Sequence, residues 1–211
     1  MAEIWEWRGV EGLVAAEVLK DDKDLYECGE VFDLCGVAEL GRTTENSSET
    51  KYYDNVPALV IDSTGADTVT CSVSGIPLDI LAKITGQKYD ADLGVLIEGE
   101  RDAKYFALGY KTKRTNGNEV FVWRYKGKFS IPDSSHSTQT AGTESNGQEI
   151  TYTGISTTYK FTKTGRPAKA INVDVALEKV DVSTFFDKVT TIDDLQPITT
   201  DPDNGEDPDN P

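Results

Sequence analysis

Apolar and polar residues alternate along much of the chain with a period of two, which is typical of strands that bury one face. Turn-forming residues at 20–24 and 63–65 separate successive segments of this kind. The predicted strands are residues 13–19, 26–37, 58–62, 67–74, 149–154 and 157–162, and a last apolar alternation runs through Ile171, Val173 and Val175. The pattern therefore predicts a mainly antiparallel β protein.

Residues 105–132, YFALGYKTKRTNGNEVFVWRYKGKFSIP, predict a hairpin. If Asn116 and Gly117 are the centre of a type I′ turn, Thr115 pairs with Asn118. The strand pairs that follow are Thr112 with Phe121, Tyr110 with Trp123 and Leu108 with Tyr125. Phe106 extends this aromatic face, and the opposite face carries Lys111, Lys113, Arg124 and Lys126. We expect the aromatic face to join the core and the basic face to meet a partner.

One segment, IPLDILAKITG, has helical spacing. Pro77 suits a first helical turn, and Gly86 suits the residue after the last turn. We expect a short helix over about residues 77–85 that flanks the sheet. Residues 39–55 are polar without helical periodicity and predict a long hairpin arm or loop, and residues 133–148 are rich in Ser, Thr and Gly and predict a mobile loop.

The composition excludes several classes of protein. The 211 residues are 37% hydrophobic and carry a net charge of −16, which argues against a broad grip on nucleic acid. No apolar run approaches a membrane span, and the N-terminus lacks the pattern of a signal peptide. We therefore expect a protein that does not enter a membrane and that is made and kept in a cytoplasm unless another machine exports it.

No residue pattern indicates catalysis, a cofactor or a metal. The single histidine, His136, lies in a Ser-rich loop where nothing would hold it against a nucleophile. Cys28, Cys35 and Cys71 lack metal-site spacing and are expected to be reduced structural thiols. The acidic tail fails the calcium-loop pattern, because Gly205 replaces a ligand. We expect no enzyme and no cofactor.

Three segments carry a resemblance to a known family: TKYYDN at 50–55, SGIPLDILAKITGQKYDADLGVLIEG at 74–99, and the hairpin continued to residue 133. Over about residues 5–176 the chain resembles the major tail protein (tail tube protein) family of long-tailed, non-contractile bacteriophages and prophages of Gram-positive bacteria. The resemblance implies an antiparallel β-sandwich or barrel-like fold with one flanking helix and long loops. We expect residues 1–196 to form one tail tube domain and residues 197–211 to be a disordered acidic tail or linker.

The resemblance also implies stacked hexameric rings that form a conduit for the genome in the virion. It implies tape-measure, tail terminator and distal tail proteins as partners, while DNA passes without specific binding. The expected contacts between subunits are Lys111, Lys113, Arg124, Lys126, Arg42, Glu45, Glu49, Lys51 and Tyr52. Two alternatives remain open at this stage: an inner-tube subunit of a contractile or secretion particle, and a carbohydrate-binding β-sandwich.

Overall fold

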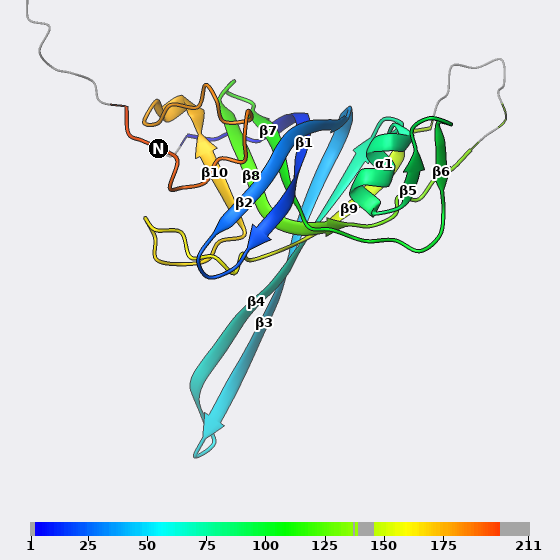
Figure 1. Cartoon of the computed structure of the whole chain (residues 1–211). Coiled ribbons are helices and arrows are strands. Elements are labelled where there is room, and N and C mark those ends of the chain that lie inside the picture. Colours follow the sequence, from blue (N-terminus) through cyan, green and yellow to red (C-terminus); the bar gives the residue numbers. More distant parts are fainter. Residues whose placement is uncertain (1–2, 137, 139–145, 199–211) are drawn as a thin grey trace, which may run out of the picture.

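The computed structural model describes residues 3–136, 138 and 146–198. Ten strands and two short helices form in the described chain (Figure 1). They are β1 (Trp7–Asp21), β2 (Tyr26–Cys35), β3 (Val37–Tyr53), β4 (Val56–Val73), α1 (Leu78–Thr85), β5 (Lys88–Asp90), β6 (Val95–Ile97), β7 (Phe106–Arg114), β8 (Glu119–Phe129), β9 (Gln148–Ile155), β10 (Ala170–Asp174) and a 3₁₀ turn, η1 (Val175–Leu177). The expectations of mobility at 139–145 and of a disordered tail at 199–211 fall outside the described residues.

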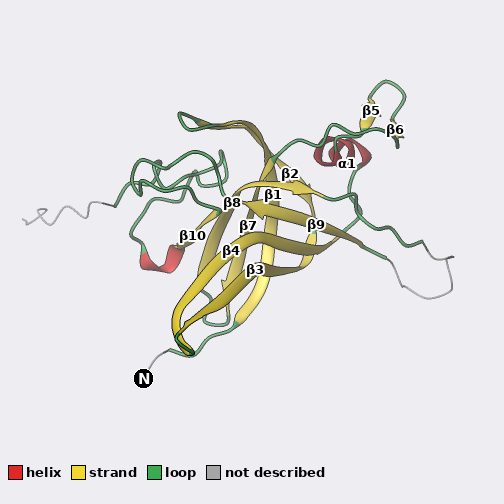
Figure 2. Cartoon of the chain, turned by 90° about the horizontal axis from the view of Figure 1, so that it is seen from below, coloured by secondary structure: helices red, strands yellow, loops and turns green. Residues whose placement is uncertain are grey.

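Eight strands form one antiparallel sheet in the order β2-β1-β7-β8-β9-β4-β3, and β10 pairs with β8. The sheet branches at β8, because residues 120–124 of this strand pair with β10 and residues 126–129 pair with β9. The sheet is strongly twisted and is not closed into a barrel, as Figure 2 shows from below. The predicted class, mainly antiparallel β with one flanking helix, is confirmed.

The sheet separates two hydrophobic clusters. The inner cluster contains Phe106, Leu108 and Tyr152, and α1 adds Ile84. The outer cluster surrounds Trp123 and is covered by largely irregular chain between residues 157 and 195. Strands that bury both faces have nearly continuous apolar sequences, and this explains why apolar residues are dense in β7 and β8.

The register predicted for the central hairpin is wrong by one residue. Tyr110 pairs with Val122, and Trp123 pairs with Gly109. The connection has three residues rather than two, since Arg114 N–H donates to Asn118 O at 2.8 Å and Gly117 alone adopts a positive φ, 88°. A slip of one residue moves side chains to the opposite face. Phe106, Leu108 and Tyr110 therefore face the inner cluster, whereas Phe121, Trp123 and Tyr125 face the outer one.

The helix agrees with the prediction for 77–85. It spans Leu78–Thr85 and ends at Gly86, whose φ of 77° lies in the left-handed region. A Cβ on Gly86 would come within 2.1 Å of Asp102 O, so both the conformation and the space require glycine here.

Two other predictions need correction. Residues 63–65 do not form a turn, because β4 runs without interruption from Val56 to Val73. The turn lies at Asp54 and Asn55, which both adopt positive φ, 52° and 64°. Residues 157–162 are not a strand, since Phe161 makes only an isolated bridge with Arg166. The strands expected over 13–19, 26–37 and 149–154 are present, and the alternation at 171–175 contributes β10.

Candidate assembly surfaces

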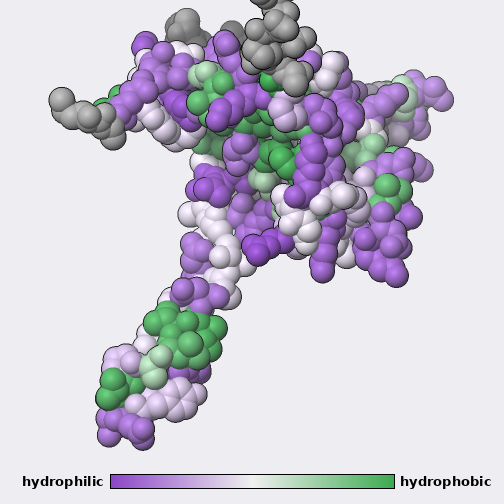
Figure 3. Space-filling view, turned by 90° about the vertical axis from the view of Figure 1, so that its left-hand side faces the viewer, coloured by the Kyte–Doolittle hydropathy of each residue, from purple (hydrophilic) through white to green (hydrophobic). Residues whose placement is uncertain are grey.

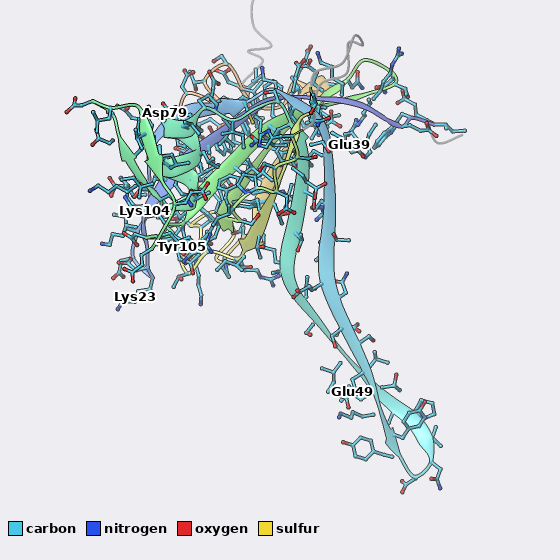
Figure 4. All side chains as sticks on the ribbon, turned by 90° about the vertical axis from the view of Figure 1, so that its right-hand side faces the viewer. Lys23, Glu39, Glu49, Asp79, Lys104 and Tyr105 are labelled. Carbon is cyan, nitrogen blue, oxygen red and sulfur yellow. The ribbon has the colours of Figure 1, made fainter. Side chains whose placement is uncertain are left out.

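Strands β3 and β4 extend beyond the body as a two-stranded arm, here defined as residues 46–64. Of its two expected forms, hairpin arm or loop, the first is confirmed. Nearly all arm residues are exposed, and Figures 1 and 4 show the arm as a narrow projection, with Glu49 labelled on it in Figure 4. A lone two-stranded hairpin is only marginally stable in water, so this length of unsupported hairpin is typical of a binding element.

The tip of the arm is apolar. Large side chains that are between 48% and 64% exposed gather there: Tyr52, Tyr53, Val56, Leu59, Val60 and Ile61. Figure 3 shows hydrophobic residues clustered on the arm, separated from the body by a more polar stretch. A contiguous exposed apolar patch of this kind marks a surface for contact with another protein.

Both faces of the arm carry this apolar character. The register pairs Tyr53 with Val56 and Glu49 with Ile61 on one face, and Thr50 with Val60 on the other. The register shifts by one residue between Lys51 and Tyr52, where Ala58 has no partner on β3. Aliphatic side chains of β4 therefore face outward on both sides, so the arm can be held between two surfaces.

An ion cluster lies at the base of the arm around Asp67. The buried Asp67 carboxylate lies 2.8 Å from Arg124 Nη1, 3.2 Å from Lys169 Nζ and 3.7 Å from Arg42 Nη1, and Thr44 Oγ1 donates to it at 2.9 Å. Burial by itself raises the pKa of Asp67, but the hydrogen bonds from Thr44 and Lys169 and the nearby cationic charges outweigh it and lower the pKa from its ordinary value. Asp67 therefore stays ionised and holds β4 against β8.

A second buried ion pair ties the body together. Lys126 Nζ lies 2.6 Å from the buried Asp21 carboxylate, which also accepts the backbone N–H groups of Thr158 and Tyr159. Burial raises the pKa of Asp21, but the hydrogen bond from Lys126 and those from the two backbone groups exceed that effect and lower the pKa. This arrangement fixes the start of the chain that covers the outer cluster.

The four hairpin cations do not share one face, so the predicted basic face is wrong. Arg124 and Lys126 lie in the two ion pairs inside the protomer. Lys113 lies 3.1 Å from both Glu11 and Glu119, and Lys111 Nζ lies 5.2 Å from the Phe121 ring centroid. The shift in register is the cause.

The other expected contact residues come together on the arm and its base. Glu45, Glu49, Lys51 and Tyr52 lie on the distal part of β3 or next to it, and Arg42 lies at the base. Lys51 and Glu49 form an ion pair with each other. The sequence reasoning missed the apolar half of the arm, residues 56–61. The Asp-Asn pair at 54–55 was the signal that could have located the turn and shown that these residues return along the same hairpin.

No candidate catalytic or metal-binding site is found in the described part of the chain. His136 is exposed in a loop. Cys28, Cys35 and Cys71 are free, and burial raises the pKa of these thiols to about 11, about 11 and about 12. Within residues 3–136, 138 and 146–198 no group of His, Cys, Asp or Glu side chains is arranged to hold a metal ion. Among the described residues, no helix is both long enough and apolar enough to cross a membrane.

A twisted antiparallel sheet with a protruding apolar arm is typical of a structural subunit that assembles with other subunits. A comparison with known families matches residues 13–193 to the phage tail tube protein family. The match spans most of the chain, and the protein belongs to that family. None of the curated proteins compared with the chain matches it. The chain is therefore a structural component of a phage tail tube and of the virion.

Proposed function

We propose that this protein forms hexameric rings that stack into the tail tube through which the phage genome passes. The observation that carries the proposal is the arm, whose apolar tip has no covering surface among the described residues. Burying such side chains stabilises by about 25 cal/mol per Å² of apolar surface, so contact between copies gives the arm a favourable environment that it lacks in one copy.

Charge supports the role of a conduit. The chain has a net charge of −16, and a surface of the same sign as DNA does not retain phosphates. We propose that DNA passes through the tube without being specifically bound, that the protein has no enzymatic role, and that tape-measure, tail terminator and distal tail proteins contact the finished tube. Residues 197–211 are proposed to form an acidic tail or linker outside the tube domain.

The proposed contacts between copies are the exposed residues among those predicted. Arg42, Glu45, Glu49, Lys51 and Tyr52 lie on the arm or at its base, where a neighbour can reach them. Lys111 and Lys113 are half-buried near the end of the central hairpin and are proposed as further contacts. Arg124 and Lys126 stabilise the protomer first, because each already has an acidic partner.

The test is to concentrate the purified full chain and examine it by negative-stain electron microscopy and analytical ultracentrifugation. Six-fold rings or tubes are expected for the wild type. Leu59→Glu places a charge in the apolar tip, and we expect it to abolish tubes while the monomer keeps its circular dichroism spectrum and melting temperature. Leu25→Glu, at an exposed apolar position on the β1-β2 turn, is the matched control. A wild-type protein that stays monomeric at every concentration contradicts the proposal.

A further inference from the structure

A pocket of about 840 Å³ opens at the base of the arm. It lies between the base of the β3-β4 hairpin and the body strands β1, β7, β8 and β10, and Glu39, labelled in Figure 4, is on its lining. The volume falls within the range of about 300–1,000 Å³ that is usual for ligand pockets. The pocket is separate from the apolar tip of the arm.

Its charge is cationic in an otherwise acidic protein. Arg42, Arg124 and Lys169 all line the pocket and all lie beside the same carboxylate, that of Asp67. One carboxylate neutralises one cation, and among the described lining residues the only other acid is the exposed Glu39. The Arg42 side chain is 51% exposed, so it can meet a ligand from outside. The pocket is suited to a carboxylate.

Most of the uncharged lining is apolar or aromatic, and Thr44, Thr64, Thr112 and Asn172 are polar. Val10, Leu40, Val120 and Val122 form part of the wall, and Tyr110 directs its hydroxyl toward Arg124, whose Nη2 donates to it at 3.2 Å. A ligand that fills this pocket therefore combines apolar or aromatic bulk with one negative charge.

The tip of the arm has this combination. Asp54 occupies the turn between Tyr53 and Asn55, and Tyr52 and Val56 flank it with exposed apolar surface. The tip cannot reach the pocket of its own chain, because Tyr53 lies seven positions beyond Asn46 on β3 and is therefore roughly 23 Å further from the base. Figure 1 shows the tip far from the body.

We infer that the pocket at the arm base receives the arm tip of a second copy, with the Asp54 carboxylate beside Arg42 and a tip tyrosine against the apolar wall. The inference rests on the proposed self-assembly and specifies its contact. A tip that enters the base of the next copy makes a head-to-tail interface, which generates rings or helical stacks rather than closed dimers. The Asp54 carboxylate of the tip then supplies the pocket with negative charge that Asp67 alone does not provide.

Charge reversal in two separate proteins tests the contact. Asp54→Lys and Arg42→Glu each place like charges together in a homogeneous assembly, so each variant alone should need at least about tenfold more protein to form tubes. In an equimolar mixture, every charge-reversed tip can meet a charge-reversed pocket, and every wild-type tip can meet a wild-type pocket. We therefore expect the mixture to form tubes at near wild-type concentration. Neither protein regains assembly unless the contact joins different copies.

Two further variants test whether the effect comes from the charge of Asp54. Asp54→Asn removes the charge and tolerates the positive φ of the turn, so it should weaken assembly without strain. Asp62→Lys makes the same charge change at an exposed acid on the arm away from the tip, and by itself it should form tubes at near wild-type concentration. Wild-type tube formation by Asp54→Asn, or failure of the mixture with both proteins folded by circular dichroism, overturns the inference. Wild-type tubes in the same experiment leave the proposed function intact.

Discussion

The ion cluster around Asp67 predicts how removing one buried charge changes the stability of the protomer. Asp67→Asn keeps the shape of the side chain but leaves the Arg124 guanidinium, 5% exposed as a residue, without its anionic partner. Tyr110 remains as a neutral acceptor for Arg124, at 3.3 and 3.2 Å from Nε and Nη2. A neutral hydroxyl does not replace a carboxylate in compensating a buried charge.

The expected loss in the free energy of unfolding is about 3–5 kcal/mol, the range for breaking a buried ion pair by removing one partner. For a domain of this size, about 2–4 °C of melting temperature is lost per kcal/mol, so the melting temperature should fall by roughly 6–20 °C. Urea unfolding of the monomer, followed by tryptophan fluorescence, measures the free energy because Trp123 is fully buried between the sheet and the covering chain.

The control is Glu17→Gln, which breaks the partly exposed pair between Glu17 and Lys104 and should cost less than about 1 kcal/mol. The double variant Asp67→Asn with Arg124→Met should be more stable than Asp67→Asn alone, since it no longer buries an uncompensated cation. If Asp67→Asn costs no more than the Glu17 control, the reasoning about the buried cluster is refuted.

Two more predictions concern acid and backbone conformation. Asp21 and Asp67 have folded-state pKa values below the ordinary 3.8, so their stabilisation is complete above that pH and is lost as the pH falls through the lower folded values. Asp21→Asn should be less stable at pH 7, and its gap from wild type should narrow below about pH 4 in urea titrations, whereas a constant gap contradicts this assignment. Gly86→Ala should cost more than about 2 kcal/mol, because it adds a clash with Asp102 O to the strain of positive φ, and an unchanged melting temperature rejects that reading.

Local signals predicted the parts of this fold that depend on short stretches of chain. Pro77 and Gly86 bounded the helix, because cap and terminator chemistry acts within one turn. The alternation of apolar and polar residues at 149–154 identified β9, because this pattern also depends on a short stretch of chain. The hairpin register failed because two-residue and three-residue connections both accept Asn-Gly, and the choice depends on neighbours. Here Thr115 exchanges hydrogen bonds with Glu6 of the N-terminal segment, so its position is set by residues more than a hundred positions away.

The alternating pattern and the helix caps determined from the sequence that this is an antiparallel β protein with one flanking helix, and the ordered motifs indicated its family. The tertiary structure decided which charges are available to a partner. Arg124 and Lys126 read as members of one basic face, yet Asp67 and Asp21, distant in sequence, take them inside the protomer. The structure also showed that residues 56–61, strand-like in sequence, form the exposed side of an arm. Burial and ion pairing depend on which distant strands meet, and one residue of register decides the face, which alternation within a strand cannot specify.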